Sequence, residues 1–299
     1  MHIVYISDAK AGHRSQALGL YHAIERQSAQ QVSFEEISIA DIPLLSLLVA
    51  LMTRKSSYLK QAPDWIISVG SHTQLRALLL ARLYRNAKTV VLMKPNYPYT
   101  CFDYAVIPAH DGVEANDRIL ITQGALNPIV NQHRHQPNRI LIALGGSSKR
   151  HAWHAAKVYA AIEQIVLQNP DAEIVLTTSR RTPNEFLAQL KQQNFAYQLQ
   201  VFPVEDTPQG WIFEQMQLAE AVWVTEDSVS MIYEALTAGC RVGVIEIDRI
   251  KQDRITASVE QLRQARMLST AMGVKALAAP INLQEADRIA KLMIESSRI

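Results

Sequence analysis

The chain has 299 residues, of which 48% are apolar and 19% are charged, and its formal net charge at neutral pH is +2. This composition excludes a disordered chain, and so small a net charge argues against nucleic acid as a partner. The length is sufficient for two domains of about 150 residues, each with its own core.

The N-terminal residues predict a buried strand and not a signal peptide. Met1–Asp8 has no basic region, no apolar h-region and no small-residue cleavage site. Nowhere does the sequence hold the roughly 18 unbroken apolar residues of a membrane span. We therefore expect a cytoplasmic protein. Cys101 and Cys240 are expected to be buried free thiols, with a disulfide between them as the alternative.

Short apolar runs alternate with amphipathic stretches along the first half of the chain, which is typical of βαβ units around a parallel sheet. We expect strands over residues 2–6, 32–38, 65–70, 88–93, 104–107 and 118–121. We expect helices over residues 14–28, 43–60 and 73–86.

The loop after the first predicted strand, Ser7–Gln16, crowds an acid, an imidazole and several cations into a short stretch. Such crowding indicates a loop that binds something. Gly12 would let the backbone turn sharply or approach a ligand closely. Asp8 and His13 are the acid and the imidazole, so one of the two is our candidate general base. The alternative is a helix cap at Asp8 with solvated neighbours.

One predicted helix is unusually apolar. Ile42–Met52 is followed at once by Thr53-Arg54-Lys55 and then by Lys60. One interpretation is a helix in the core of the first domain. The other is an exposed apolar helix whose basic surroundings touch an anionic membrane face. Four further basic residues that flank the next helix would extend that surface: Arg76, Arg82, Arg85 and Lys88.

Two later strand ends in the first half also carry polar residues. Ser71 and Thr73 follow the 65–70 strand, where a helix cap explains them as well as a ligand site does. His110 and Asp111 follow the 104–107 strand, and a carboxylate can orient an imidazole. Because side chains of adjacent residues rarely face each other, a structural role for this pair is the alternative.

The polar, turn-rich stretch 127–138 is the best candidate for a linker, after which the α/β pattern restarts. We therefore expect two Rossmann-like domains that face across a cleft, residues 1–135 and 136–299. Strands are expected over 139–144, 173–178, 199–202, 221–225 and 242–246. Helices are expected over 151–168, 184–194, 210–219, 228–238, 255–265 and 284–297, the last of which is a candidate to cross back toward the first domain.

Three polar clusters in the second half each follow a predicted strand and precede a predicted helix. They are Gly145–Arg150, Thr177–Pro183 and Thr225–Ser230. Because the carboxyl ends of parallel strands meet at one crevice, where ligands bind, we expect the three clusters to converge on a single site.

The residue types in these clusters suit a phosphorylated, hydroxyl-rich small molecule. The Gly145-Gly146 pair would let backbone amides approach a pyrophosphate, and hydroxyls and cations nearby would add donors. Acids in the third cluster, together with Glu234 further along its helix, would accept sugar hydroxyls. Capped helices with solvated charges are the alternative. The candidate donor-binding residues are Gly145, Gly146, Ser147, Ser148, Lys149, Ser179, Arg180, Arg181, Glu226, Asp227, Ser228, Ser230, Met231 and Glu234.

Several common motifs are missing from the sequence. It contains no Gly-x-Gly-x-x-Gly dinucleotide fingerprint, no phosphate-binding Gly-x-x-x-x-Gly-Lys-[Ser/Thr] loop, no Gly-x-Ser-x-Gly elbow and no His-Glu-x-x-His. His151 and His154 lie on a predicted helix without a third ligand in register, so we expect no metal site there.

Five segments together resemble the motifs of one family. They are Asp8-x-Lys10-x-Gly12-His13-x-x-Gln16, Pro108-x-His110-Asp111, Gly145-Gly146-Ser147, Thr178–Pro183 and Thr225–Met231. The family is that of the plant mitochondrial-fission ("elongated mitochondria") protein, whose bacterial members are regarded as glycosyltransferases of the lipooligosaccharide outer core. The resemblance covers nearly the whole chain. It implies a GT-B architecture, with the acceptor in the N-terminal domain and the sugar nucleotide in the C-terminal domain.

The chain also looks like the lipid-linked sugar transferases of peptidoglycan synthesis, which use a Gly-Gly-Ser loop and a helix glutamate for the donor. That similarity places Gly145–Ser147 on phosphate and Glu234 on ribose. The residues then expected on the acceptor side are Lys10, Gly12, Gln16, His110 and Asp111.

We predict a metal-independent glycosyltransferase that needs no cofactor and moves a sugar from a nucleotide-sugar donor to a glycolipid of the cell envelope. Peripheral contact with the anionic face of the inner membrane would fit such an acceptor. One alternative is a non-catalytic scaffold of the same fold that binds a protein or membrane partner. Another is a sugar-nucleotide epimerase or hydrolase, which would act on the donor alone.

Overall fold

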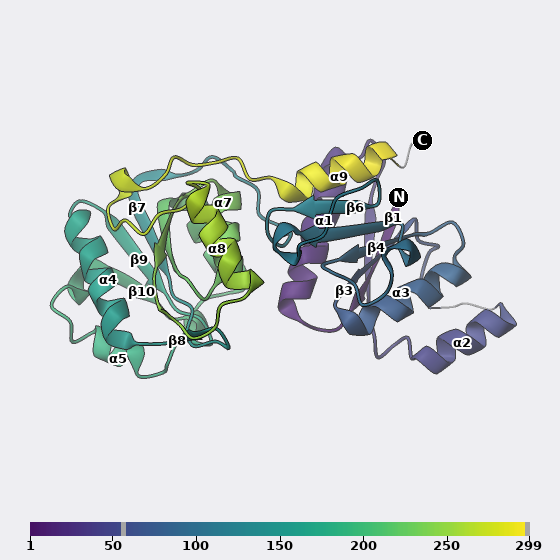
Figure 1. Ribbon diagram of the computed structural model, residues 1–299, viewed down its shortest axis with the longest axis horizontal. Coiled ribbons are helices and arrows are strands. Elements are labelled where there is room, and N and C mark those ends of the chain that lie inside the picture. Colours follow the sequence, from purple (N-terminus) through teal and green to yellow (C-terminus); the bar gives the residue numbers. More distant parts are fainter. Residues whose placement is uncertain (55–57, 297–299) are drawn as a thin grey trace. The chain divides into compact units, whose positions relative to one another are not determined.

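The computed structural model describes residues 1–54 and 58–296, and it divides the chain into two compact units (Figure 1). Unit 1 consists of residues 1–128 together with the C-terminal segment from Gln284, and unit 2 runs from Ile129 to Leu283. Along the chain, unit 2 begins at Ile129 instead of the expected residue 136, because the Ile129 side chain is buried in the core of unit 2.

Unit 1 is built on one six-stranded sheet of order β2-β1-β3-β4-β5-β6, in which every pair of neighbours is parallel. Its strands are β1 (His2–Ser7), β2 (Ser33–Ser38), β3 (Trp65–Val69), β4 (Lys88–Leu92), β5 (Tyr104–Pro108) and β6 (Ile119–Thr122). Its helices are α1 (Ala11–Gln27), α2 (Leu44–Thr53), α3 (Ser71–Leu83) and α9 (Glu285–Ser296).

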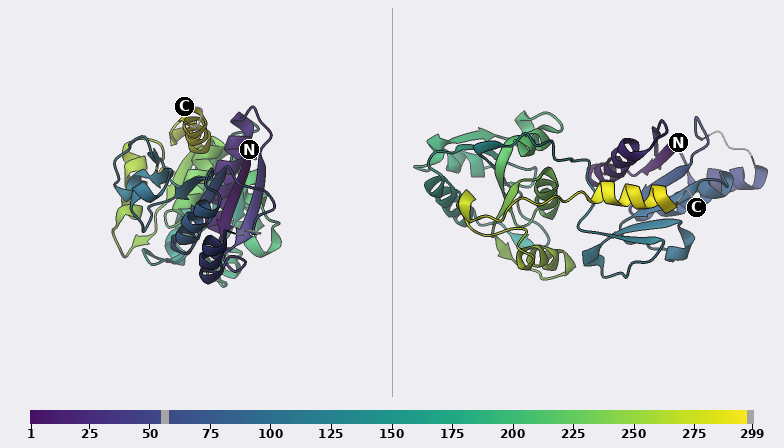
Figure 2. Two further views of the ribbon diagram at one scale, coloured as in Figure 1. Left: turned by 90° about the vertical axis from the view of Figure 1, so that its right-hand side faces the viewer. Right: turned by 90° about the horizontal axis from the view of Figure 1, so that it is seen from above.

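Helices cover both faces of this sheet, so its central strands are buried on both sides. Ile3 and Tyr5 of β1 pack with α1 and α9, whereas Val4 and Ile6 pack with α2 and α3. This alternation follows from the twofold side-chain period of a strand. The C-terminal helix α9, yellow in Figure 1, lies beside α1 (Figure 2) and buries its apolar stripe there. Helix α9 therefore belongs to the core of unit 1.

Unit 2 repeats the architecture around a five-stranded parallel sheet of order β10-β9-β7-β11-β12. Its strands are β7 (Gln136–Ala143), β9 (Glu173–Thr177), β10 (Leu199–Phe202), β11 (Ala219–Thr225) and β12 (Arg241–Ile245), with a separate antiparallel pair, β8 (His151–Ala152) and β13 (Asp248–Arg249). Its helices are α4 (Ala155–Gln168), α5 (Phe186–Leu190), α6 (Trp211–Leu218), α7 (Val229–Ala238) and α8 (Arg254–Gln264). Both units are Rossmann-like α/β folds, as predicted.

Three local expectations differ from the structure. Helix α2 ends at Thr53 because the next residue, Arg54, has a left-handed backbone (φ 53°). Lys55, part of the expected basic surroundings of this helix, lies outside the described residues. Helix α4 begins at Ala155 instead of 151 because His151 and Ala152 pair with β13. Both cysteines are free thiols, but Cys101 is exposed instead of buried. None of the helices in the described ranges has the length and apolar character that a membrane span requires.

Candidate functional site

The three polar clusters of unit 2 begin at the same level of its sheet. Strands β9, β7 and β11 are neighbours, and Ala143 lies opposite both Thr177 and Val224. The segments that follow these three residues therefore leave the sheet side by side, at the carboxyl edge where ligands bind in such folds.

Gly145 is the point where the three clusters contact one another. Its carbonyl oxygen accepts hydrogen bonds from the hydroxyls of Ser179 and Thr182, at 3.0 and 2.5 Å. Its amide donates to the hydroxyl of Thr225 at 2.6 Å. One residue thus joins the loop after β7 to the loops after β9 and β11.

The next residue explains why this loop carries two glycines. The Gly146 amide donates to the Asp227 carboxylate at 3.0 Å. A β-carbon at Gly146 would overlap the backbone carbonyl of Arg181, and one at Gly145 would overlap the Asp227 carboxylate. Only glycine allows the three loops to approach this closely.

The hydrogen bonds of this loop differ from the expectation that its amides face a ligand phosphate. The amides of Gly145 and Gly146 donate to Thr225 and Asp227, and the amide of Ser148 donates to the carbonyl of His151 at 3.0 Å. The Gly-Gly pair therefore shapes the site by holding its loops together. Of the amides in this loop, those of Gly145, Gly146 and Ser148 are therefore engaged within the protein, and side chains around the loop have to supply most contacts to a bound anion.

The cations of the site are of two kinds. Arg181 forms an ion pair of 2.6 Å with Asp227, whose carboxylate is fully buried. The guanidinium charge of Arg181 therefore compensates the Asp227 carboxylate. Lys149 and Arg180 are exposed, and neither pairs with an acid among residues 1–54 and 58–296. These two side chains are free to meet an anionic ligand.

Glu226 is not open to sugar hydroxyls as expected, because its buried carboxylate is paired with Arg249. The imidazole of His151 lies close by, with its Nε2 atom 4.0 Å from the same carboxylate. Burial lowers the pKa of His151, against the opposing effect of Glu226 and Asp227. Arg249 was not among the predicted site residues, because the two-residue strand β13 that carries it is too short to show a periodic pattern.

Glu234 is the acid of the site that stays unpaired. No hydrogen bond or ion pair engages its carboxylate within the described part of the chain. The residue is half-buried at the surface, and desolvation by the surrounding protein raises the pKa of Glu234 to about 8. Ser230, one turn earlier on α7, is exposed and shares its helix face, while Met231 is half-buried and Ser228 is buried at the start of the helix.

In unit 1 the structure joins Asp8 and His13 into a pair. The His13 Nδ1 atom lies 2.9 Å from Asp8 Oδ1, and the Lys10 ammonium lies 3.1 Å from Asp8 Oδ2. Burial works against ionisation of Asp8, but the hydrogen bonds from Lys10 and His13 outweigh it and hold the pKa of Asp8 below its ordinary value. Asp8 is therefore an ionised, buried carboxylate that orients the imidazole.

The His13 ring is positioned from a second side by Gly70. This residue has a left-handed backbone (φ 85°), and a β-carbon there would come within 2.5 Å of His13 Cε1. Among the described residues, none hydrogen-bonds to the other ring nitrogen, Nε2, and the His13 side chain is 19% exposed. A His13 that donates from Nδ1 to Asp8 has an accepting Nε2, so it is the better of the two candidate bases.

The remaining acceptor-side candidates lie near the carboxyl edge of the same sheet. The sharp turn occurs at Ala9 (φ 62°), whereas Gly12 is exposed in the first turn of α1. Gln16 is buried and donates to the sulfur of Met93 at 3.4 Å. His110 and Asp111 do approach each other, with 3.8 Å between Nε2 and Oδ1, and both side chains are buried.

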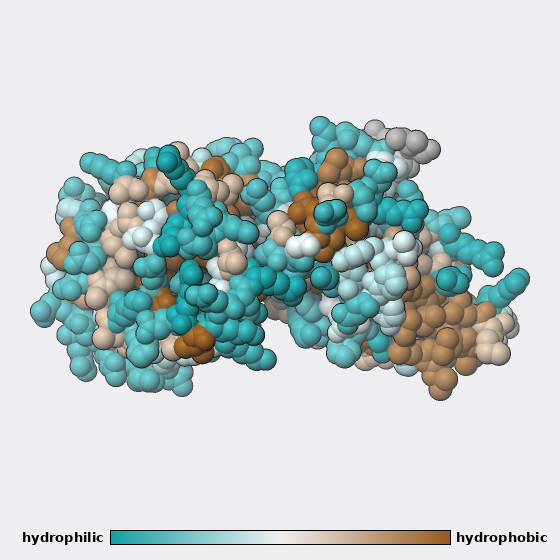
Figure 3. Space-filling model, in the orientation of Figure 1, coloured by the Kyte–Doolittle hydropathy of each residue, from teal (hydrophilic) through white to brown (hydrophobic). Residues whose placement is uncertain are grey.

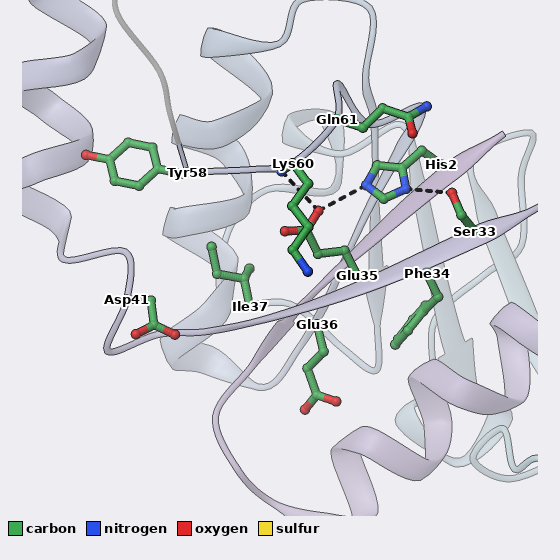
Figure 4. Close-up of a pocket in the computed structure, with 10 residues that line it drawn as sticks. All are labelled: His2, Ser33, Phe34, Glu35, Glu36, Ile37, Asp41, Tyr58, Lys60 and Gln61. Atoms are coloured by element: carbon green, nitrogen blue, oxygen red, sulfur yellow. Dashed lines mark hydrogen bonds and ion pairs between the residues drawn. The ribbon is translucent and has the colours of Figure 1, made fainter.

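Unit 1 also has a hollow of about 630 Å³ at the exposed edge of its sheet (Figure 4). His2 lies at its wall, held by Ser33 at 2.8 Å and by Glu35 at 3.2 Å, with Lys60 nearby. None of the candidate site residues lines this hollow. In the two described ranges, no group of three or more His, Cys, Asp or Glu side chains is placed to hold a metal ion.

Comparison with known protein families identifies the chain. The model of the family "Mitochondrial fission ELM1" matches residues 11–296. The chain belongs to this family. A relative of this chain, the uncharacterized protein RP120 of Rickettsia prowazekii, is 25% identical over 290 residues, which is 80% of this chain and 81% of the relative.

Solved structures with a similar fold include enzymes of sugar-nucleotide chemistry. MurG of Acinetobacter baumannii has a TM-score of 0.52 at 15% identity, over 98% of this chain and 92% of its own. The ADP-heptose heptosyltransferase II of E. coli has a TM-score of 0.50 at 11% identity, over 99% of this chain and 100% of its own. The UDP-GlcNAc 2-epimerase of Methanocaldococcus jannaschii has a TM-score of 0.52 at 13% identity, over 98% of this chain and 99% of its own. These similarities confirm the predicted GT-B type of fold.

Proposed function

We propose that this ELM1-family protein is a glycosyltransferase that moves a sugar from a nucleotide-sugar donor to a glycolipid of the cell envelope, such as the lipooligosaccharide core. We base the proposal on the junction of three strand-end loops at Gly145. The segments that leave it carry Lys149 and Arg180, two exposed cations with no acidic partner in the described ranges, and helix α7 after the third loop carries Glu234. The acceptor would be reached from the cytoplasmic face of the inner membrane.

The unit 2 loops would hold the donor. Lys149 and Arg180, which have no acidic partner in the described ranges, would bind the diphosphate, and Ser147 is exposed beside them. Negative charge grows on this diphosphate as the glycosidic bond breaks, so cations there stabilise the transition state more than the ground state. Glu234 would accept hydrogen bonds from the ribose hydroxyls or, when protonated, donate one to them.

His13 would take the proton of the acceptor hydroxyl. In this reaction the acceptor oxygen forms a bond to the anomeric carbon, the bond to the diphosphate oxygen breaks, and the hydroxyl proton moves to Nε2. Asp8 is hydrogen-bonded to Nδ1 and stabilises the resulting imidazolium. General-base catalysis of this kind contributes roughly 10²–10⁴ in rate.

The test is a transfer assay with labelled UDP-, ADP-, GDP- and CMP-sugars and an extract of envelope glycolipids. We expect one donor to label a lipid, and we expect His13→Ala to lower that rate by about 10²–10⁴ with nucleotide affinity unchanged. Asp8→Asn should lower the rate through the orientation of His13. Full transfer activity in the His13→Ala variant would show that another group is the base.

Two other functions remain to be distinguished from transfer. The fold is shared with a UDP-GlcNAc 2-epimerase, and an enzyme of that type would consume the donor when no lipid is present. The family name favours a scaffold that binds a partner, and a scaffold would bind none of the four nucleotides. The transfer assay, run with and without lipid, separates the epimerase from the transferase, and a binding measurement with the four nucleotides separates the scaffold from both.

A further inference from the structure

Helix α2 carries apolar side chains on two opposite faces. Its ten residues, Leu44–Thr53, include no charged side chain. Leu47 and Ala50 are buried, and Leu47 packs against α3. The opposite face carries a second apolar stripe, Leu45, Leu48, Val49 and Met52, with exposed fractions of 75, 48, 52 and 85%. Residues with this spacing share one side of a helix, and that side usually faces a core.

This stripe forms a distinct apolar surface. Figure 3 shows it as the brown area at the lower right, where α2 lies in Figure 1. The other large apolar side chains with comparable exposure in the described ranges lie on separate elements: Leu167, Tyr197, Phe202, Ile250 and Leu292. Single exposed side chains are ordinary, but four on one helix mark an interaction surface.

The chain around α2 is strongly basic. Residues 41–103 contain eight Lys and Arg but three acids, Asp41, Asp64 and Asp103, whereas the whole chain has nearly equal numbers of each sign. Asp64 accepts a hydrogen bond from the His2 amide at 2.6 Å. Four of the cations are exposed: Arg54 and Lys60 after α2, and Arg82 and Arg85 at the end of α3, which packs against α2. An apolar stripe with basic neighbours is complementary to the anionic surface of a phospholipid membrane.

We infer that α2 is a membrane-docking helix, which lies in the plane of an anionic bilayer with Leu45, Leu48, Val49 and Met52 inserted at the boundary between headgroups and acyl chains. The four exposed cations contact lipid phosphates around it. The inference does not depend on sugar transfer, since a scaffold of this fold would dock in the same way. It does give a transferase access to a lipid-linked acceptor.

The test is flotation of the full chain with vesicles of phosphatidylcholine alone or of phosphatidylcholine mixed with phosphatidylglycerol. We expect binding to the anionic vesicles only, weakening as salt is raised. The Leu45→Ser/Met52→Ser double variant should lower the partition coefficient about ten-fold or more, since two inserted side chains are lost. Arg82→Gln/Arg85→Gln should lower it by a similar factor.

A matched control uses exposed apolar side chains of unit 2. The Leu167→Ser/Tyr197→Ser variant replaces two apolar side chains whose exposed fractions are 61 and 85%. It should bind vesicles as the wild type does. Nucleotide affinity should be the same in both double variants, because the candidate donor loops lie in unit 2. Equal vesicle binding by both variants would overturn the inference. So would a wild-type dimer in sedimentation velocity that Leu45→Ser/Met52→Ser dissociates, because the stripe would then be covered by a second copy.

Discussion

At the scale of single residues, the candidate site depends on which charges are already paired. Arg181 and Glu226 are engaged with Asp227 and Arg249, so they hold the loops together. Because the two carboxylates are buried, removing the arginine partner of either leaves an uncompensated interior charge and destabilises the fold. Lys149 and Arg180 are exposed cations, and neither compensates a buried carboxylate in the described ranges. Residue types alone could not separate the paired charges from the unpaired ones, because pairing depends on contacts between segments that are distant in the sequence.

The raised pKa of Glu234 has a consequence for stability. Desolvation raises the pKa of the Glu234 carboxyl from the ordinary value of 4.5 to about 8. The folded protein therefore binds more protons than the unfolded chain between these values. The stabilising contribution is complete below about pH 4.5 and is lost as the pH rises through about 8.

We expect the free energy of unfolding of the wild type to fall across this range relative to the Glu234→Gln variant, which cannot ionise. Each unit of pKa shift corresponds to about 1.4 kcal/mol, so the difference amounts to a few kcal/mol at most. Urea unfolding of both proteins at a series of pH values measures it. Parallel pH profiles would mean that Glu234 is solvated in the folded protein.

At the scale of elements, close approach of loops accounts for the paired glycines. We predict that Gly146→Ala destabilises the protein by about 1–3 kcal/mol, because its β-carbon would overlap the carbonyl of Arg181. The matched control is Gly12→Ala, since a β-carbon at Gly12 meets no atom within 4 Å. Gly12 lies in the first turn of α1, where alanine is tolerated at least as well as glycine. Thermal unfolding of the two variants should differ clearly; similar melting temperatures would contradict the packing argument.

The main strands were predictable because buried parallel strands are short apolar runs bounded by polar segments. The convergence of the three loops followed from the same rule, since strand ends in one parallel sheet share an edge. The β8–β13 pair and its Arg249 were not predictable, because two-residue strands have no pattern. The direction of the Gly145 and Gly146 amides was also beyond prediction, as it depends on Thr225 and Asp227.

At the scale of the whole molecule, the chain consists of two Rossmann-like units, and its last helix belongs to the first. Helix α9 buries Ile289 and Met293 against unit 1, and Asp287 pairs with Arg26 of α1 at 2.7 Å. Membership of the ELM1 family and the likeness to solved GT-B structures define the fold. The ligand has to be inferred from the side chains at the strand ends of unit 2.

We infer that these strand ends bind a nucleotide. Titration calorimetry with UDP, ADP, GDP and CMP tests it most directly. We predict that at least one nucleotide binds the wild type, and that Arg180→Gln and Lys149→Gln each weaken it about ten-fold or more, since a charge-assisted hydrogen bond is lost. The exposed Lys191 of unit 2 provides the control, Lys191→Gln, with unchanged affinity. Failure of all four nucleotides to bind, or an Arg180→Gln variant with wild-type affinity, would contradict the account.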